Sequence, residues 1–220
     1  MSLRESICRG ANAQSLSLTD EQADLLTRYV ELLAKWNKAY NLTAVRDPQE
    51  MVSRHILDSL SIVPHVFGEN LMDVGSGPGL PGIPLAIMYP EKQFTLLDSN
   101  GKKTRFMTQA RMELGLKNVR VENTRVESFR AERPFDVIMS RAFSSLLDMV
   151  NGTAHLLSPE GSFLAMKGLY PEEELQELQQ QRPGIGLSKS LVLDVPGCEA
   201  QRHLVILHTA MSEKNVPSPQ

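Results

Sequence analysis

The sequence has few cysteines and no long apolar run. Cys8 and Cys198 lie far apart in unrelated surroundings, so they form neither a metal-ligand spacing nor a redox pair. No stretch approaches the roughly 18 consecutive apolar residues that a membrane span needs. The polar start, MSLRESICRGAN, lacks the apolar core of a signal peptide. We therefore expect reduced thiols, no metal site, no membrane association and a cytosolic location.

The chain also lacks an excess of positive charge. Its formal net charge is −3, which argues against a general nucleic-acid binder. Residues 101–130 depart from this average, since they hold eight Lys or Arg against three Glu. Lys102, Lys103 and Arg105 begin a predicted helix there. They are candidates for contacts with RNA phosphates, and a merely solvated helix face is the alternative.

The length and composition are typical of one globular domain, with or without a small extension. The chain has 220 residues, of which 41% are hydrophobic. Helical periodicity dominates its first 65 residues. Thr19 and Gln22 predict a capping box at the start of one helix. Asp47 is expected to cap a second helix, with Pro48 at its first position and Glu50 closing the box.

Short apolar runs alternate with helical segments from residue 66 onward. This alternation predicts a mostly parallel sheet with helices on both faces, a Rossmann-like α/β fold. The last two runs, LSKSLVLDV and RHLVILHT, predict an antiparallel hairpin at the C-terminal end. The earlier strands are expected at NLMDVG (70–75), QFTLLD (93–98), VRVEN (119–123), FDVIMS (135–140) and GSFLAMKG (161–168).

A glycine-rich loop follows the first predicted strand, in DVGSGPGLPGIPLA. Ligands of open parallel sheets bind beyond the carboxyl ends of the strands. Gly75, Gly77 and Gly79 let the backbone turn there and approach a ligand closely. Asp98 ends the second strand, where a carboxylate accepts hydrogen bonds from ribose hydroxyls. The pattern predicts a cofactor with a ribose, and a plain strand-to-helix turn with a solvated Asp98 is the alternative.

Two types of cofactor compete for this loop. A dinucleotide fingerprint needs a glycine three residues after Gly77, where this chain has Leu80. Pro78, Pro81 and Pro84 reshape the start of the helix, and proline lacks the N–H group that a pyrophosphate site needs. The chain has no Tyr-x-x-x-Lys pair of a short-chain reductase. An adenosyl ligand without a pyrophosphate fits better, and S-adenosylmethionine is such a ligand.

Five stretches of the chain resemble one protein family. They are WNKAYNLTAVRDP (36–48), RHILDSL (54–60), DVGSGPGLPGIPLAI (73–87), FTLLDSNGKK (94–103) and IMSRAF (138–143). They closely resemble the bacterial RsmG family, also called glucose-inhibited division protein B. Members of that family are small-subunit ribosomal RNA guanine-N7 methyltransferases. The resemblance extends from about residue 18 to about residue 209.

The resemblance implies a class I methyltransferase fold with S-adenosylmethionine as cofactor. It divides the chain into an N-terminal helical extension at 1–65, a methyltransferase domain at 66–210 and a disordered tail at 211–220. The implied partner is 16S ribosomal RNA or the small ribosomal subunit. We expect the protein to be a monomer.

The resemblance also implies roles for individual residues. These are Gly75, Gly77 and Leu80 in the cofactor loop, Asp98 at the ribose, Val126 and Glu127 at the adenine, Arg141 at the methionine end, and Lys167 and Arg202 on the substrate side. An arginine just past the fourth strand is suited to this role, because its planar fork holds a carboxylate or phosphate with two hydrogen bonds. A solvated surface position is the alternative, more so for the two substrate-side residues.

Missing motifs agree with N7 as the methylated atom. Enzymes that methylate an exocyclic amine commonly carry an Asn- or Asp-Pro-Pro-aromatic loop after the fourth strand, and this chain has SRAF there. Methylation of carbon needs a cysteine nucleophile, and neither cysteine is suitably placed. Guanine N7 has a lone pair and no proton, so we predict no catalytic acid or base. A noncatalytic adenosyl-binding module that binds RNA or a partner through its N-terminal helices is the alternative function.

Overall fold

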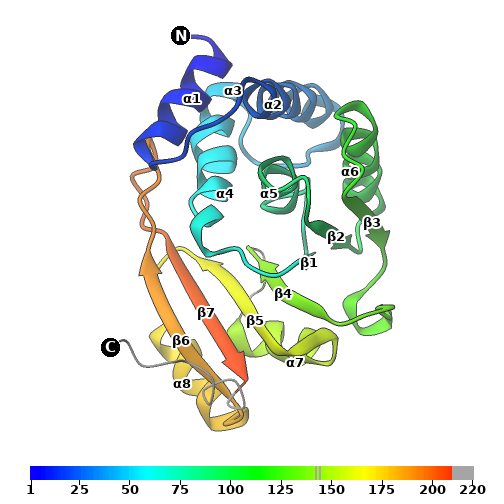
Figure 1. Cartoon of the computed structure of the whole chain (residues 1–220), viewed down its shortest axis with the longest axis vertical. Coiled ribbons are helices and arrows are strands. Elements are labelled where there is room, and N and C mark those ends of the chain that lie inside the picture. Colours follow the sequence, from blue (N-terminus) through cyan, green and yellow to red (C-terminus); the bar gives the residue numbers. More distant parts are fainter. Residues whose placement is uncertain (142, 144, 210–220) are drawn as a thin grey trace.

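The computed structural model describes residues 1–141, 143 and 145–209, so the predicted tail at 211–220 lies outside the described residues (Figure 1). Its centre is a sheet with the strand order β3-β2-β1-β4-β5-β7-β6. Strands β1 to β5 are parallel, and β7 is antiparallel to both β5 and β6. The Rossmann-like prediction with a C-terminal hairpin is confirmed. The strands are β1 (Asn70–Val74), β2 (Gln93–Asp98), β3 (Val119–Asn123), β4 (Phe135–Ser140), β5 (Leu157–Lys167), β6 (Ile185–Val192) and β7 (His203–Thr209).

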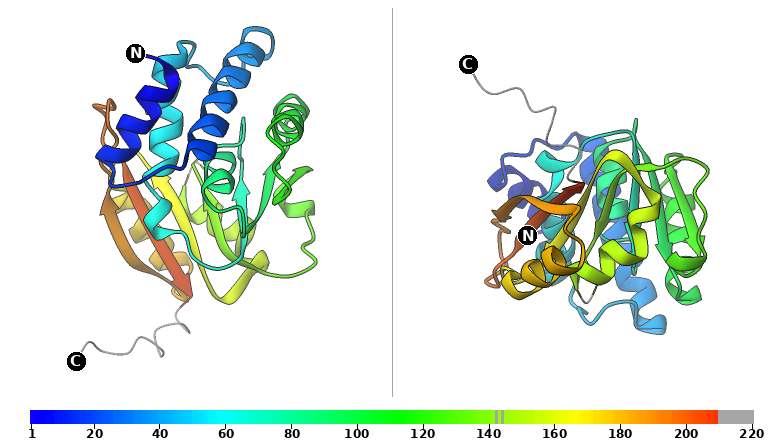
Figure 2. Two further views of the ribbon diagram at one scale, coloured as in Figure 1. Left: turned by 45° about the horizontal axis from the view of Figure 1, so that its top comes forward. Right: turned by 90° about the horizontal axis from the view of Figure 1, so that it is seen from below.

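Helices cover both faces of the sheet (Figures 1 and 2). One face packs against α1 (Leu3–Ala13), α2 (Asp20–Tyr40), α3 (Pro48–Met51), α4 (Asp58–Leu60), α5 (Gly82–Met88) and α6 (Gly101–Glu113). The other face packs against α7 (Leu146–Thr153) and α8 (Glu172–Gln181). Alternate strand residues supply the two cores, as the two-residue period of a strand requires. Leu71 and Met139 belong to the first core, and Met72 and Ile138 belong to the second.

The N-terminal helices share the first core with the sheet. Ile7 of α1 and Leu33 of α2 are fully buried in it. The hydroxyl of Tyr29, also buried, donates a hydrogen bond of 2.8 Å to the carbonyl of Pro78 in the glycine loop. Residues of the predicted extension therefore contact the loop that the cofactor prediction rests on.

Two helices were not predicted from the sequence, and one cap differs. Helix α1 begins with a capping box of Ser2 and Glu5, and α8 follows β5. The predicted box of Thr19 and Gln22 is present at the start of α2. Asp47 caps α3 through the N–H of Gln49, so the expected closure by Glu50 is wrong. The expected second helix is also interrupted.

A π-helix, Val52–Leu57, replaces the middle of that second helix. Its wider turn ends where the N–H of Asp58 donates to the carbonyl of Ser53, five residues earlier. Such segments inside α-helices occur frequently at functional sites. Short 3-10 turns complete the described part of the chain at Val63–His65, Val126–Ser128 and Ala154–Leu156. Among the described residues, no helix is long and apolar enough to span a membrane.

Candidate active site

The loop after β1 is held by a buried carboxylate beneath it. Oδ2 of Asp73 accepts a hydrogen bond of 2.9 Å from the N–H of Gly82, at the start of α5. Burial raises the pKa of Asp73 to about 7. Gly75 has a φ of 70° and donates its N–H to the carbonyl of Leu97 at 2.8 Å. The chain thus turns sharply over the carboxyl ends of β1 and β2.

Gly82 performs the packing role that a dinucleotide fingerprint gives to its third glycine. A Cβ atom at this position would collide with Cδ2 of Leu96 on β2 and lie 2.8 Å from Oδ2 of Asp73. The absence of a side chain therefore lets α5 approach the sheet closely. The dinucleotide fingerprint has this glycine at the position that Leu80 occupies here. The signal for it was present two residues later, in the LPGIP segment.

Asp98 lines a cavity at the end of β2, and Glu127 of the next loop is the other carboxylate among its described lining residues. Its side chain is 9% exposed. Oδ2 accepts from the N–H of Gly77 at 2.9 Å, and Oδ1 accepts from the N–H of Asn100 at 2.8 Å. Two carboxylate oxygens have about four lone-pair positions, so Asp98 retains capacity for a diol.

The cavity beside Asp98, which we call the cofactor cavity, has a volume of about 280 Å³. It lies beyond the carboxyl ends of β1, β2 and β3, next to the point where the strand order reverses. Gly75 and Asp98 form one side, and Val126, Glu127 and Phe143 line it as well. A flat ring can lie against the apolar side chains of Val126 and Phe143, with a ribose at Asp98.

The residues present fit S-adenosylmethionine. Asp98 offers a carboxylate for the ribose diol, and Val126 and Phe143 offer apolar surface for the adenine. The bare backbone at Gly75 leaves room for the methionine portion. A Cβ atom at Gly77 would meet nothing within 4 Å, so the space beside the loop is open.

A second cavity, which we call the basic cavity, lies beside the ends of β4, β5 and β7. Its volume is also about 280 Å³. Val45, Arg54, His55, Asp58, Arg141, Met166, Lys167, Gly168 and Arg202 line it. The register explains the meeting of these distant segments, because Ser140 pairs with Ala165 and Lys167 pairs with His203.

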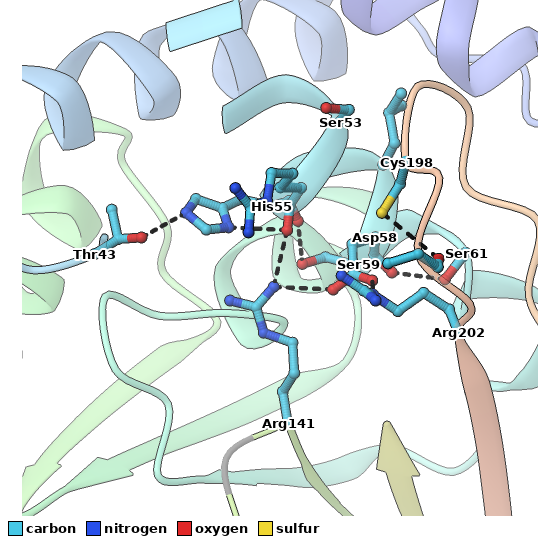
Figure 3. A network of polar contacts seen from close by, with 12 residues as sticks. Thr43, Ser53, His55, Asp58, Ser59, Ser61, Arg141, Cys198 and Arg202 are labelled. Carbon is cyan, nitrogen blue, oxygen red and sulfur yellow. Dashed lines mark hydrogen bonds and ion pairs between the residues drawn. The ribbon is translucent and has the colours of Figure 1, made fainter. Parts of the chain in front are cut away.

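Asp58 connects two arginines across the basic cavity (Figure 3). Its Oδ2 accepts a hydrogen bond of 2.9 Å from Nη1 of Arg141, and its Oδ1 accepts one of 2.9 Å from Nε of Arg202. The carboxylate side chain is 2% exposed, whereas the two arginine side chains are 26% and 23% exposed. Nη1 of Arg141 also donates to the carbonyl of Arg54 at 3.2 Å. A buried acid thus fixes two partly exposed cations.

His55 forms a neutral wall of the same cavity (Figure 3). Its Nδ1 lies 2.9 Å from the carbonyl of Arg54, so Nδ1 carries the proton. Nε2 then accepts from the hydroxyl of Thr43 at 2.8 Å. Burial, and next the positive charge of Arg141, lower the pKa of His55 to about 4.

Lys167 enters the cavity from the end of β5. Its Nζ lies 2.8 and 3.2 Å from the two carboxylate oxygens of Glu174 on α8. Glu174 also accepts a hydrogen bond from the N–H of Leu146 at the start of α7. Lys167 is therefore held by a helix that the sequence analysis did not predict.

The predicted site residues fall into two groups. Gly75, Asp98, Val126 and Glu127 line the cofactor cavity, and Gly77 contacts Asp98. Arg141 lines the basic cavity with Lys167 and Arg202. Leu80 is 2% exposed and belongs to the core between α5 and the sheet.

Sequence reasoning missed Asp58 and His55 as residues of this site. Both lie in RHILDSL, a stretch that was used only for its resemblance. A charged residue in the apolar run of a predicted helix was the available signal, because buried carboxylates are rare unless they are paired.

Solved structures with the same fold are methyltransferases. A glycopeptide N-methyltransferase, MtfA, in complex with S-adenosyl-L-homocysteine, aligns with a TM-score of 0.60 at 11% identity, over 70% of this chain and 87% of that chain. A ribosomal protein L11 methylase from Lactobacillus delbrueckii subsp. bulgaricus aligns with a TM-score of 0.53 at 14% identity, over 70% and 76%. The chain thus has the fold of class I S-adenosylmethionine-dependent methyltransferases.

Sequence comparison gives the family. A family model described as "GidB: rRNA small subunit methyltransferase G" matches residues 22–205. The chain is 57% identical over 209 residues to a ribosomal RNA small subunit methyltransferase G of Ectopseudomonas mendocina (strain ymp), covering 94% of this chain and 96% of that protein. A protein of the same name from Marinomonas sp. (strain MWYL1) is 52% identical over 203 residues, covering 92% and 96%. This chain belongs to the rRNA small subunit methyltransferase G family, which confirms the resemblance.

Proposed function

We propose that the protein transfers a methyl group from S-adenosylmethionine to N7 of a guanine in 16S ribosomal RNA. The observation that carries the proposal is the position of the two cavities at one edge of the sheet. Phe143 lines the cofactor cavity and Arg141 lines the basic cavity, so the segment 141–143 contributes a residue to each cavity. A methyl donor in one cavity and an RNA nucleotide at the other would meet at this segment.

The residues around the two cavities fit a transfer without a general base. The lone pair of N7 forms the new bond to the methyl carbon, and the sulfur keeps the electron pair of the bond that breaks. No proton leaves the base, and the positive charge passes from sulfur to guanine. Both ring nitrogens of His55 are held in hydrogen bonds, to Thr43 and to the carbonyl of Arg54, so neither serves as a general base. Catalysis then comes from orientation and from exclusion of water.

The proposed roles follow the placement of the side chains. Gly75, Gly77, Asp98, Val126 and Glu127 bind the cofactor, with Leu80 supporting the loop from the core. Lys167 and Arg202 bind the substrate. Arg141 lies on the basic side of the 141–143 segment, so it orients the substrate next to the methionine end.

Mapping of N7-methylguanosine in 16S ribosomal RNA tests the proposal. Cells that lack the protein should lose one such modification, and the wild-type chain should restore it. Purified protein should then transfer labelled methyl groups to small-subunit RNA or particles from those cells, but not to material from the parent cells. A noncatalytic RNA-binding module would leave the modification intact in both strains, which would contradict the proposal.

A further inference from the structure

The basic cavity holds more positive charge than its own carboxylates neutralise. Arg54, Arg141, Lys167 and Arg202 line it, and Asp58 is the only acidic residue among the lining residues that the structure describes. Glu174 neutralises Lys167 from outside the lining. The adjacent histidine is neutral, because burial lowers its pKa to about 4. Among the described residues, four cations therefore face two carboxylates, Asp58 and Glu174, and Asp58 is shared by Arg141 and Arg202, so a net positive charge remains.

A guanine base alone does not account for this charge. Methyl transfer to N7 makes the base a cation, so uncompensated cations around it would oppose the reaction. Guanidinium groups that donate to N7 would also occupy the lone pair that must form the new bond. The surplus charge is better explained by an anion that binds together with the base. In RNA that anion is a phosphodiester group.

The two arginines are arranged to receive such a group. Arg141 binds its described partners through Nη1, and Arg202 binds its partners through Nε and Nη1. The Nη2 groups of both arginines donate to none of the described residues. Arg54, whose side chain is exposed, also donates to none of them. Guanidinium groups match phosphate oxygens well, because their N–H groups form planar forks.

Asp58 keeps these forks in place before a ligand arrives. It is 1% exposed and uses one oxygen for each arginine. Its position depends on the end of the π-helix, where its N–H donates to the carbonyls of Ser53 and His55. Preorganised donors lose less conformational entropy when a ligand binds.

We propose that the basic cavity is a binding site for a phosphodiester group of the RNA strand that carries the methylated guanine. Asp58 is its positioning residue, and Arg54, Arg141 and Arg202 supply the donors. The inference rests on the proposed function, because it names the part of the substrate that this cavity binds. It also makes the helices of residues 1–65 a part of the substrate site.

Titration with inorganic phosphate tests the site without methyl transfer. In the ¹⁵N-labelled protein, phosphate should shift the guanidinium resonances of Arg141 and Arg202, and sodium chloride of equal ionic strength should not. Guanosine at the same concentration should leave them unchanged, whereas guanosine 5′-monophosphate should shift them as phosphate does. Shifts with guanosine but not with phosphate would overturn the proposal and make the cavity a base pocket. Absence of shifts with phosphate in the wild type would also overturn it.

Binding to small-subunit particles gives a second measurement. For Arg202→Gln we expect affinity to fall roughly ten-fold or more, as for loss of a charge-assisted hydrogen bond. The logarithmic dependence on salt should become shallower by about 0.7 to 0.9 for the lost phosphate contact. Arg202→Lys should keep the salt dependence of the wild type while it binds more weakly. Arg120→Gln is the control, because Arg120 lies on the edge strand β3, outside the basic cavity, and like Arg202 is ion-paired through its guanidinium group. Equal salt dependence for Arg202→Gln, Arg120→Gln and the wild type would contradict the proposal.

Asp58→Asn tests whether Asp58 positions the two arginines, because the variant leaves the arginines that bind the phosphate unchanged. Both arginines remain, so we expect a KM for particles that rises about ten-fold, while the affinity for S-adenosylmethionine stays within about two-fold. A wild-type KM would overturn the positioning role. If this variant fails to fold, Arg202→Gln and the phosphate titration still decide the proposal. Failure of the proposed function is distinct, since wild-type protein would then show phosphate shifts without any transfer to 16S ribosomal RNA.

Discussion

The two cavities have equal volumes but are built in opposite ways. The cofactor cavity consists of backbone turns, two carboxylates and apolar side chains at the ends of β1 to β4. The basic cavity is built of cations, held by one buried acid from outside the strand-and-helix alternation. S-adenosylmethionine, the ligand proposed for the first cavity, carries a sulfonium cation. The second fits a polyanion.

The cavities also differ in how far apart their residues are in the sequence. Gly77 and Asp98, which bond to each other in the cofactor cavity, are 21 positions apart. Asp58 and Arg202, which bond to each other in the basic cavity, are 144 positions apart. This hydrogen bond of the cofactor cavity thus joins residues that are close in the sequence. The basic cavity, in contrast, is lined by residues from Val45 to Arg202, which come together only in the folded chain.

The largest expected effect is a loss of cofactor binding from a substitution in the cofactor cavity alone. Gly75→Val places a β-branched residue at a φ of 70° and a side chain at the cavity wall. The backbone strain is of order 1–3 kcal/mol. We expect affinity for S-adenosylmethionine to fall by more than roughly 100-fold, or about 3 kcal/mol. Calorimetry measures it, with circular dichroism to show that the variant is folded. A folded variant that binds normally would remove the loop from the site.

The effect of pH on the free energy of unfolding should have opposite signs for His55 in the basic cavity and for Asp73 beneath the glycine loop. Folding lowers the pKa of His55 from 6.5 to about 4, so the unfolded chain takes up this proton first as pH falls. The contribution of His55 to stability is therefore lost between about pH 6.5 and 4, by at most about 3 kcal/mol. Folding raises the pKa of Asp73 from 3.8 to about 7. Its contribution is therefore lost in the opposite direction, as pH rises from 3.8 to 7.

Denaturant unfolding at several pH values checks this prediction. His55→Gln should lose less stability than the wild type on acidification from pH 6.5 to 4. Asp73→Asn should lose less stability than the wild type when pH is raised from 4 to 7. Parallel pH profiles for the wild type and both variants would show that neither group changes its pKa on folding.

Asp98→Ala should have an intermediate effect on cofactor binding. Loss of charge-assisted hydrogen bonds to the ribose should reduce affinity for S-adenosylmethionine by about 1–3 kcal/mol. The salt dependence of RNA binding should stay that of the wild type, because Asp98 lies outside the basic cavity. Calorimetry and particle binding measure the two effects. Unchanged cofactor affinity would exclude Asp98 from the ribose contact.

The smallest effect concerns the basic start of α6, whose Lys102 and Lys103 are among the described lining residues of neither cavity. Lys102 is exposed, and Nζ of Lys103 lies 3.9 Å from Oδ2 of Asp98. Lys102→Gln with Lys103→Gln should weaken RNA binding uniformly across sequences and reduce its salt dependence, because phosphate contacts carry no sequence information. Filter binding at several salt concentrations measures this. Binding identical to the wild type would make this helix face merely solvated.

The sequence predicted what depends on neighbouring residues. The glycine loop and Asp98 follow from short motifs. The parallel direction of the strands follows from strands that alternate with helices, which the two-residue and helical periods reveal. The position of Asp58 does not, since nothing near it in the chain indicates partners at 141 and 202. Lys167 was expected at the substrate, but its contact with Glu174 on α8 required a helix that was missed. The residues of the cofactor cavity are therefore predictable from one sequence. The contacts within the basic cavity become visible only in the folded structure.

Lys167→Ala tests the division between the cavities most directly. Its side chain lines the basic cavity and makes no contact with Asp98 or the glycine loop among the described residues. We predict that affinity for S-adenosylmethionine stays within about two-fold, while single-turnover methyl transfer to small-subunit particles falls by roughly ten-fold or more. Transfer at the wild-type rate, or an equal loss of cofactor affinity and transfer, would contradict the assignment of cofactor and RNA to separate cavities.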